Sequence, residues 1–163
     1  MLALKLPSFE DYELIDSGNF KKLERFGQFI LSRPEPQAIW SPTLSEAEWA
    51  KKAQAVFNRK SGAATNAEDG NWELKPGMPE QWHIRYDFEG MHLNFRLGLT
   101  SFKHVGIFPE QAENWNYIYR GLRKMDIDHP MVLNLFAYTG GASLAAKAAG
   151  ADVVHVDSVK PVV

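Results

Sequence analysis

The pattern that most constrains the fold lies near the end of the 163-residue chain. A nearly continuous apolar run covers 131–136, a Tyr-Thr-Gly-Gly turn 138–141, an alanine-rich segment 142–149 and a second apolar run 152–157. Apolar runs without alternation are typical of strands that are buried on both faces of a parallel sheet. Gly150 follows the alanine-rich segment, as is common at the end of a helix. The sequence therefore predicts a strand–helix–strand unit that opens a parallel α/β domain near Pro130.

The turn at 138–141 indicates what such a unit can bind. Ligands of parallel sheets lie at the carboxyl ends of the strands, and Asp157 ends the second run, where a carboxylate can accept the hydroxyl protons of an adenosine ribose. A dinucleotide pyrophosphate requires G-x-G-x-x-G, whereas this chain has Gly-Gly-Ala-Ser-Leu-Ala over 140–145. S-adenosylmethionine (SAM) has no phosphate, so the pattern favours SAM over a nicotinamide dinucleotide. The same glycines also fit plain packing of a helix on a strand, so that interpretation stays open.

Short extended segments dominate the chain before residue 103. We expect strands at 12–16 and 23–32, with a bend at Arg33-Pro-Glu-Pro36. Ser45-Glu-Ala-Glu48 predicts a helix start, and an apolar spacing continues the helix to Asn58. Residues 61–70 have no periodicity and are expected to form a mobile loop.

The clearest strand signal is an alternation of apolar and polar residues over 81–98, interrupted by Glu89-Gly90. It predicts a hairpin with one buried face. The opposite face would pair Asp87 with His92, Arg85 with Asn94 and His83 with Arg96. That polar face is either solvated, as in many antiparallel sheets, or directed at a substrate.

A helix is expected from Pro109 to before Asp128, with Trp115, Ile118, Tyr119 and Leu122 as its apolar stripe. The predicted organisation is therefore α+β followed by α/β. A β-rich N-terminal domain covers 1–102, a bridging segment and helix cover 103–129, and the first βαβ unit of a Rossmann-like domain covers 130–163.

Composition excludes several classes of function. The chain has no cysteine, which excludes disulfides, thiolate zinc sites and cysteine nucleophiles within these residues. A net charge of -2 provides no overall attraction to nucleic acid or membranes, so such binding needs a local patch. The apolar start is too short for a signal peptide, and no run approaches the roughly 18 apolar residues of a membrane span. We expect a cytoplasmic protein without a membrane partner or a metal site.

Seven stretches, in three parts of the chain, resemble a known family. Residues 132–145, 150–151 and 155–158 closely resemble the first two cofactor motifs of class I SAM-dependent methyltransferases related to the large-subunit ribosomal RNA methyltransferases. Residues 103–111 are similar to the segment before that family's Rossmann domain, with His104 in place of the usual Thr and Pro109-Glu110 in place of Leu-Asp. Residues 12–16, 22–27 and 33–40 resemble the N-terminal β portion of a bacterial branch.

The resemblance implies SAM as cofactor, RNA as substrate and a set of cofactor-binding residues. Phe108 and Gln111 would lie in a segment that folds over the cofactor, although Phe108 and Pro109 also fit a simple helix start. Asn134 would shape the pocket around the methionine part of SAM, or it is a satisfied polar residue at a strand end. The full implied set is Phe108, Gln111, Asn134, Phe136, Tyr138, Thr139, Gly140, Gly141, Asp157 and Ser158.

The family pattern is incomplete in this chain. Val163 falls where the family's next helix begins, and the later Asp/Asn-Pro-Pro motif that holds the target base is absent, so no catalytic residue is assigned. We expect part of a longer methyltransferase, inactive by itself, with an exposed sheet edge that pairs with another copy.

Two other classes of function stay open. One is a non-catalytic RNA-binding or assembly module with a vestigial βαβ unit. Its support is a set of basic residues, Lys51, Lys52, Arg59, Lys60, Arg120, Arg123 and Lys124. The other is a nicotinamide-dependent enzyme, which the glycine pattern disfavours.

Overall fold

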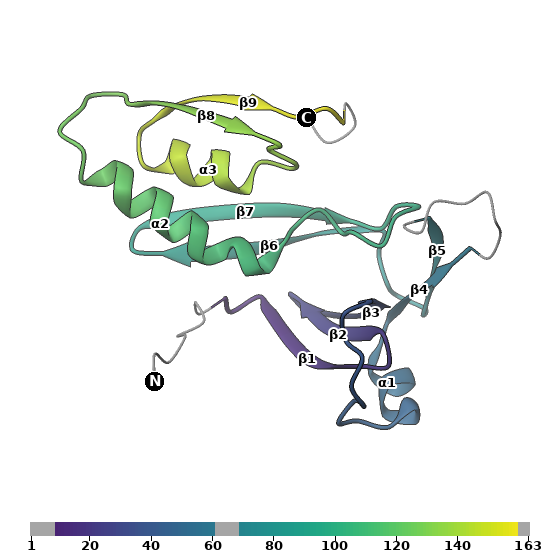
Figure 1. Ribbon diagram of the computed structural model, residues 1–163. Helices are drawn as coiled ribbons and strands as arrows, with labels where there is room; N and C mark the ends of the chain where they lie inside the picture. The colour runs from purple at the N-terminus through teal and green to yellow at the C-terminus, as the bar shows by residue number, and fades with distance from the viewer. Residues whose placement is uncertain (1–8, 61–68, 160–163) are drawn as a thin grey trace. The chain divides into compact units, whose positions relative to one another are not determined.

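A computed structural model describes residues 9–60 and 69–159 (Figure 1). The described chain divides into two compact units. One contains residues 10–84 and 95–106, and the other contains Phe9, 85–94 and 107–159. No helix in the described part is long and apolar enough to cross a membrane. The domain boundaries expected after residues 102 and 129 remain predictions.

The first unit is built on a five-stranded sheet. Its strands, in both sequence and spatial order, are β1 (Tyr12–Gly18), β2 (Lys21–Phe26), β3 (Phe29–Pro34), β4 (Ala55–Arg59) and β5 (Gly70–Leu74). Neighbouring strands are antiparallel except for β3 and β4, which are parallel. Leu23, Phe26, Leu31 and Ala55 are fully buried in this unit. The predicted β-rich N-terminal part is confirmed.

The prediction of one extended run over 23–32 is wrong. Gly27 has φ +62°, and the chain turns at Gly27-Gln28 so that Phe26 pairs with Phe29. A left-handed backbone is accessible to glycine at little cost, which makes this short turn possible. The run therefore forms two antiparallel strands, β2 and β3.

The predicted helix begins where expected but ends too early. Helix α1 covers Glu46–Lys52, and Ser45 forms the full capping box with Glu48, as the sequence indicates. Its continuation to Asn58 is wrong, because Ala53 adopts an extended conformation and β4 begins at Ala55. Gln54 pairs with Ile30 through two hydrogen bonds of 2.7 Å, so sheet formation overrides the helical spacing.

The expected loop at 61–70 lies mostly outside the described residues. Its last residue, Gly70, is not in a loop but begins β5, a strand that the sequence analysis missed. A Cβ at position 70 would lie 2.4 Å from the Asn58 carbonyl oxygen, so only glycine fits this strand pair.

The hairpin is confirmed as β6 (Gln81–Phe88) and β7 (Met91–Gly98), joined by Glu89 and Gly90 at φ +46° and +87°. Ile84, Tyr86, Met91 and Leu97 are buried. The polar side chains of the opposite face are exposed, and Asp87 and His92 lie 2.5 Å apart as the register requires. The polar face of the hairpin is therefore open to solvent.

The second unit carries the predicted βαβ pattern. Its elements are the short 3₁₀ helix η1 (Pro109–Gln111), α2 (Ala112–Arg123), β8 (Met131–Leu135), α3 (Gly141–Ala148) and β9 (Asp152–Val156). Strands β8 and β9 are parallel, and α3 runs along the pair in Figure 1. Gly150, at φ +97°, ends α3 by donating to the Lys147 carbonyl. The fold class is confirmed: a β-rich sheet followed by a βαβ unit.

Aromatic side chains form the core of this second unit. The Tyr86 ring lies 4.8 Å from that of Phe9 and 5.5 Å from that of Trp115, in edge-on arrangements. The Tyr86 hydroxyl donates to Asn116 at 2.9 Å. Trp115 and Tyr119 of the predicted stripe are buried. This packing fixes α2, against which α3 begins.

Candidate functional site

The turn between β8 and α3 has a strained backbone. Phe136, Tyr138 and Gly140 have φ values of +56°, +51° and +93°. Aromatic residues rarely adopt this left-handed region, and such strain persists only where surrounding contacts hold it. The Phe136 side chain is 89% exposed. The turn therefore presents apolar surface to solvent at the carboxyl end of β8.

Asp157, directly after β9, is hydrogen-bonded to this turn. Its Oδ2 accepts the Tyr138 N–H at 2.7 Å, and its Oδ1 accepts the Val159 N–H at 2.9 Å. These hydrogen bonds, first that from Val159 and then that from Tyr138, lower the pKa of Asp157. The carboxylate is thus held ionised beside the turn, as the predicted cofactor site requires.

Phe108 and Gln111, in the segment before α2, are both predicted to bind the cofactor, and Phe108 is the one that contacts the turn. The Phe108 ring lies 4.9 Å from the Tyr138 ring. The side chain of Gln111 instead accepts a hydrogen bond of 2.7 Å from Asn114, one turn along α2. Thr139 and Ser158 are exposed, on the turn and directly after Asp157.

The two glycines of the turn have clear packing roles. A Cβ at position 140 would lie 3.1 Å from Cε1 of His155, and a Cβ at position 141 would lie 2.8 Å from the Trp115 ring. Gly140 also needs glycine for its φ of +93°. Packing of α3 against β9 and α2 therefore explains both glycines without a ligand, and the assignment of the SAM site depends on Asp157 and the turn rather than on them.

The Asn134 amide faces α3. It donates to the Ser143 hydroxyl at 2.9 Å, and that hydroxyl lies 2.9 Å from Nδ1 of His155. The sequence analysis missed Ser143 and His155. The parallel register that pairs position 134 with position 155 is the signal that could have indicated them.

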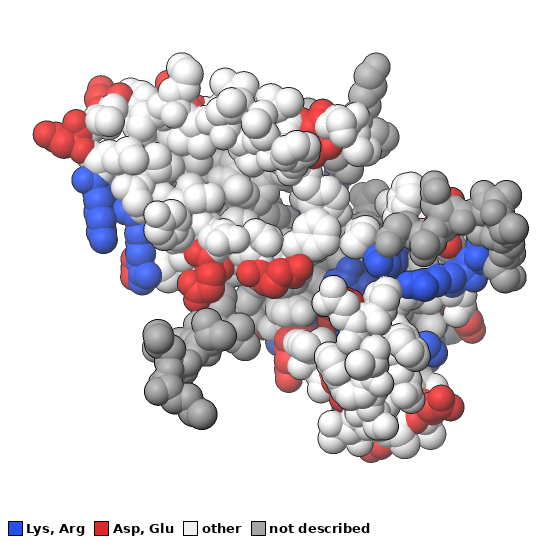
Figure 2. Space-filling view, in the orientation of Figure 1, with Lys and Arg blue, Asp and Glu red and all other residues white. Residues whose placement is uncertain are grey.

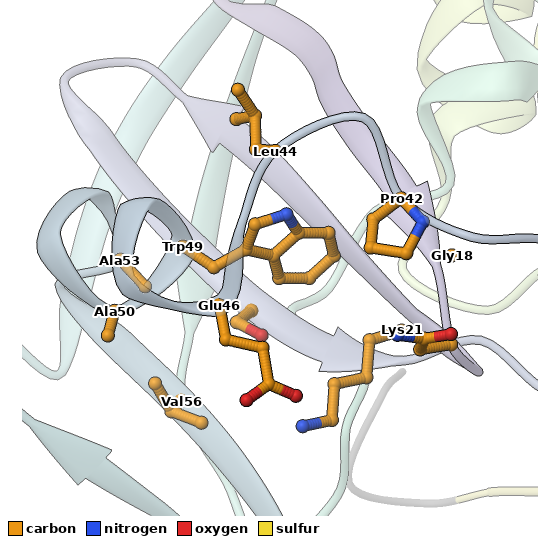
Figure 3. Close-up of a pocket in the computed structure, with 11 residues that line it drawn as sticks. Gly18, Lys21, Pro42, Leu44, Glu46, Trp49, Ala50, Ala53 and Val56 are labelled. Carbon is orange, nitrogen blue, oxygen red and sulfur yellow. The ribbon is translucent and has the colours of Figure 1, made fainter.

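A separate pocket of about 250 Å³ lies in the first unit (Figure 3). Its wall is the indole of Trp49, and Lys21 and Glu46 bring their charged ends to one side. The Trp49 indole N–H donates to the carboxylate of the buried Asp16 at 2.9 Å. The same carboxylate accepts the backbone N–H of Leu44 at 2.8 Å. None of the predicted cofactor-binding residues lines this pocket.

The basic residues of the alternative hypothesis form two exposed groups. Lys51, Lys52, Arg59 and Lys60 belong to the first unit, and Arg120, Arg123 and Lys124 to the second. Arg120 is paired with Glu89 and stacks on the Phe88 ring at 4.5 Å. Within residues 9–60 and 69–159, no three His, Asp or Glu side chains are grouped so as to hold a metal ion.

Comparisons with known proteins agree with this geometry at the level of fold. No protein-family model and no curated protein matches the chain. The chain is similar to the SAM-dependent methyltransferase from Agrobacterium tumefaciens, with a TM-score of 0.79 and 40% sequence identity. The match covers 93% of this chain and 45% of the A. tumefaciens chain.

Two solved structures at lower identity share the fold. One is a candidate SAM-dependent methyltransferase from Streptococcus mutans, with a TM-score of 0.61 and 18% identity over 93% of this chain and 40% of that one. The other is SMU.776, a candidate methyltransferase in complex with SAH, with a TM-score of 0.59 and 19% identity. The match covers 93% of this chain and 39% of that one. The chain therefore matches SAM-dependent methyltransferases in structure and spans less than half the length of each of these three.

Proposed function

We propose that the chain forms part of a SAM-dependent methyltransferase that acts on ribosomal RNA, and that residues 1–163 alone transfer no methyl group. The observation that carries this proposal is the hydrogen bond between Asp157 and Tyr138, in a chain 40% identical to the A. tumefaciens methyltransferase. It joins the carboxyl ends of two parallel strands, where ligands of α/β sheets bind.

The residues around the turn fit the ribose end of SAM. A carboxylate has about four lone-pair positions, so Asp157 keeps acceptor capacity for ribose hydroxyls after accepting the two backbone hydrogens. SAM itself supplies an electrophilic methyl group, and the protein's task is to orient it. The other residues that would hold SAM are Phe108, Gln111, Asn134, Phe136, Tyr138, Thr139, Gly140, Gly141 and Ser158.

Titration of the ¹⁵N-labelled chain tests the cofactor. Saturable shifts of the backbone amides over 136–141 and 157–159 are expected with SAM and not with NAD, because the turn has no pyrophosphate-binding glycine pattern. NMR detects the weak binding expected of a chain that covers 45% of its relative. Shifts with NAD alone would revive the nicotinamide alternative, and no shift with either cofactor would contradict the proposal.

The RNA substrate is supported by the sequence resemblance and by the exposed basic residues. Lys51 and Lys52 at the end of α1, and Arg59 and Lys60 at the end of β4, are exposed. Such side chains contact phosphates, and their binding weakens with salt. Salt-dependent RNA binding by a chain that does not bind SAM would favour the non-catalytic RNA-binding module instead.

We also propose that residues 1–163 self-associate through the exposed edge of the two-stranded β8–β9 sheet, which also has an uncovered apolar face. Its side chains are apolar and 44–80% exposed: Met131, Leu133, Leu135, Val154 and Val156. In Figure 2 the surface over the βαβ unit is largely free of charged side chains. Exposed apolar patches of this kind are typical of contact surfaces.

Substitution of Leu133 by lysine is expected to weaken this self-association by about tenfold or more, because it places a charge where apolar surface is buried. Sedimentation equilibrium measures the effect. Tyr117→Lys is the matched control, since Tyr117 is 80% exposed on α2. A strictly monomeric wild-type chain would contradict the proposal.

A further inference from the structure

Three polar side chains connect the three elements of the βαβ unit. Asn134 lies on β8, Ser143 in the first turn of α3 and His155 on β9, opposite Asn134 in the parallel register. The Asn134 amide nitrogen lies 2.9 Å from Ser143 Oγ, which lies 2.9 Å from His155 Nδ1. All three are half-buried. They therefore form one continuous chain of hydrogen bonds between sheet and helix.

The chemistry of these groups sets the direction of the first hydrogen bond only. The Asn134 amide nitrogen can only donate, so Ser143 Oγ accepts its hydrogen. A hydroxyl has one hydrogen and two acceptor lone pairs, so Ser143 can donate to Nδ1 of His155 or accept a hydrogen from it. The three side chains stay connected in either case.

The His155 ring also supports the turn. Its Cε1 lies 3.1 Å, and its Nδ1 3.4 Å, from where a Cβ of Gly140 would stand. Gly140 precedes α3 as its N-cap and has no side-chain cap hydrogen bond. The imidazole thus contacts the backbone that links the strained turn to the helix.

We propose that Ser143 and His155 are positioning residues for the candidate cofactor site, holding the Gly140 turn at the ends of β8 and β9. This inference rests on the proposed SAM site. It assigns SAM affinity to two side chains that are not in the predicted set and that act through the turn.

Few charged groups surround the imidazole. Strand β8 has no charged residue, and the one in α3, Lys147, is paired at 3.2 Å with Asp152 at the start of β9. Asp157 remains, and the charge of His155 contributes to the lowered pKa of that carboxyl.

Matched variants separate support of the turn from general stability. His155→Leu keeps the bulk and removes the hydrogen-bonding nitrogen, and Ser143→Ala removes the hydroxyl that connects Asn134 to His155. Each is expected to weaken SAM binding by about tenfold. His155→Asn places an amide oxygen near Nδ1 and is expected to keep wild-type affinity. His129→Asn is the control, since His129 is exposed and faces Asp128.

The same NMR titration with SAM measures the affinities of the variants. Unchanged affinity in both His155→Leu and Ser143→Ala, or a His155→Asn variant that binds SAM as weakly as His155→Leu, would overturn the inference.

A second readout works without SAM. In ¹⁵N spectra of the chain without SAM, the backbone amide signals over 136–141 should shift in His155→Leu and Ser143→Ala and keep their wild-type positions in His129→Asn. Unchanged signals in both His155→Leu and Ser143→Ala would overturn the positioning role even if the wild type bound no SAM. Failure of the proposed function is thus distinguishable, because it is read from the wild-type titration alone.

Discussion

Substitution of Arg33 by alanine is expected to destabilise the chain by about 3–5 kcal/mol, because it leaves the Glu24 carboxylate buried without its partner. Glu24 is fully buried, and Arg33 is 3% exposed. The guanidinium donates to both carboxylate oxygens, at 2.5 and 3.0 Å, and to the Lys103 carbonyl at 3.3 Å. Tyr12 donates to the same carboxylate at 2.9 Å.

Urea unfolding of three variants isolates this effect. Arg25→Ala removes a similar side chain, which pairs with the exposed Glu13 and donates to the Gly27 and Glu10 carbonyls, but it leaves no buried charge unpaired and is expected to cost about 2 kcal/mol or less. The double variant Glu24→Leu with Arg33→Met should recover most of the stability lost in Arg33→Ala, since it buries no unpaired charge. Equal losses of unfolding free energy in Arg33→Ala and Arg25→Ala would show that the unpaired Glu24 charge does not cause the destabilisation.

Acidification should reveal the same pair. Burial by itself would raise the pKa of Glu24, but the charge and hydrogen bonds of Arg33, with Lys22 and Tyr12, hold it below its ordinary value of 4.5. A carboxyl whose pKa is lower in the folded state stabilises the fold above its unfolded-state pKa, and this contribution is lost as the pH falls through the folded-state pKa. The wild type should therefore lose stability below about pH 4.5, and the double variant should lack this part of the loss.

Sequence patterns predicted the elements that local periodicity determines. The alternation over 81–98 and the apolar runs around the Gly-Gly turn each fix an element without reference to distant residues. Sequence patterns did not predict the elements that depend on pairing between residues far apart in the sequence. The end of α1 and strand β4 depend on parallel pairing with β3, through Gln54 and Ile30, and no local pattern indicates this contact.

The candidate site shows the same division. Asp157 and the turn follow from position in the βαβ pattern, and the structure brings them together. Gln111 and Asn134 were assigned by resemblance, and their amides form hydrogen bonds with Asn114 and Ser143 that the motif does not indicate. Side-chain direction depends on neighbouring elements, so neither motif nor spacing could predict it.

Asp157 offers the sharpest test of the site. Asp157→Ala is expected to weaken SAM binding by about tenfold to a hundredfold, because it removes a charged acceptor for two ribose hydroxyls. Asp152→Ala removes the same charge from the opposite end of β9, where the carboxylate pairs with exposed Lys147, and should leave SAM affinity unchanged. Equal affinities in the two variants, measured by NMR titration, would reject the assignment.

Loss of the Tyr138 hydrogen bond could by itself disturb the turn, so Asp157→Asn is needed beside the alanine variant. It keeps a carbonyl oxygen for the Tyr138 N–H and loses the charge. If the carboxylate binds ribose, Asp157→Asn should retain the wild-type amide spectrum of the turn and still bind SAM more weakly. Because its pKa is lowered from 3.8, Asp157 stays ionised between pH 7 and pH 5. The part of the SAM affinity that depends on the Asp157 charge should therefore be constant over that interval.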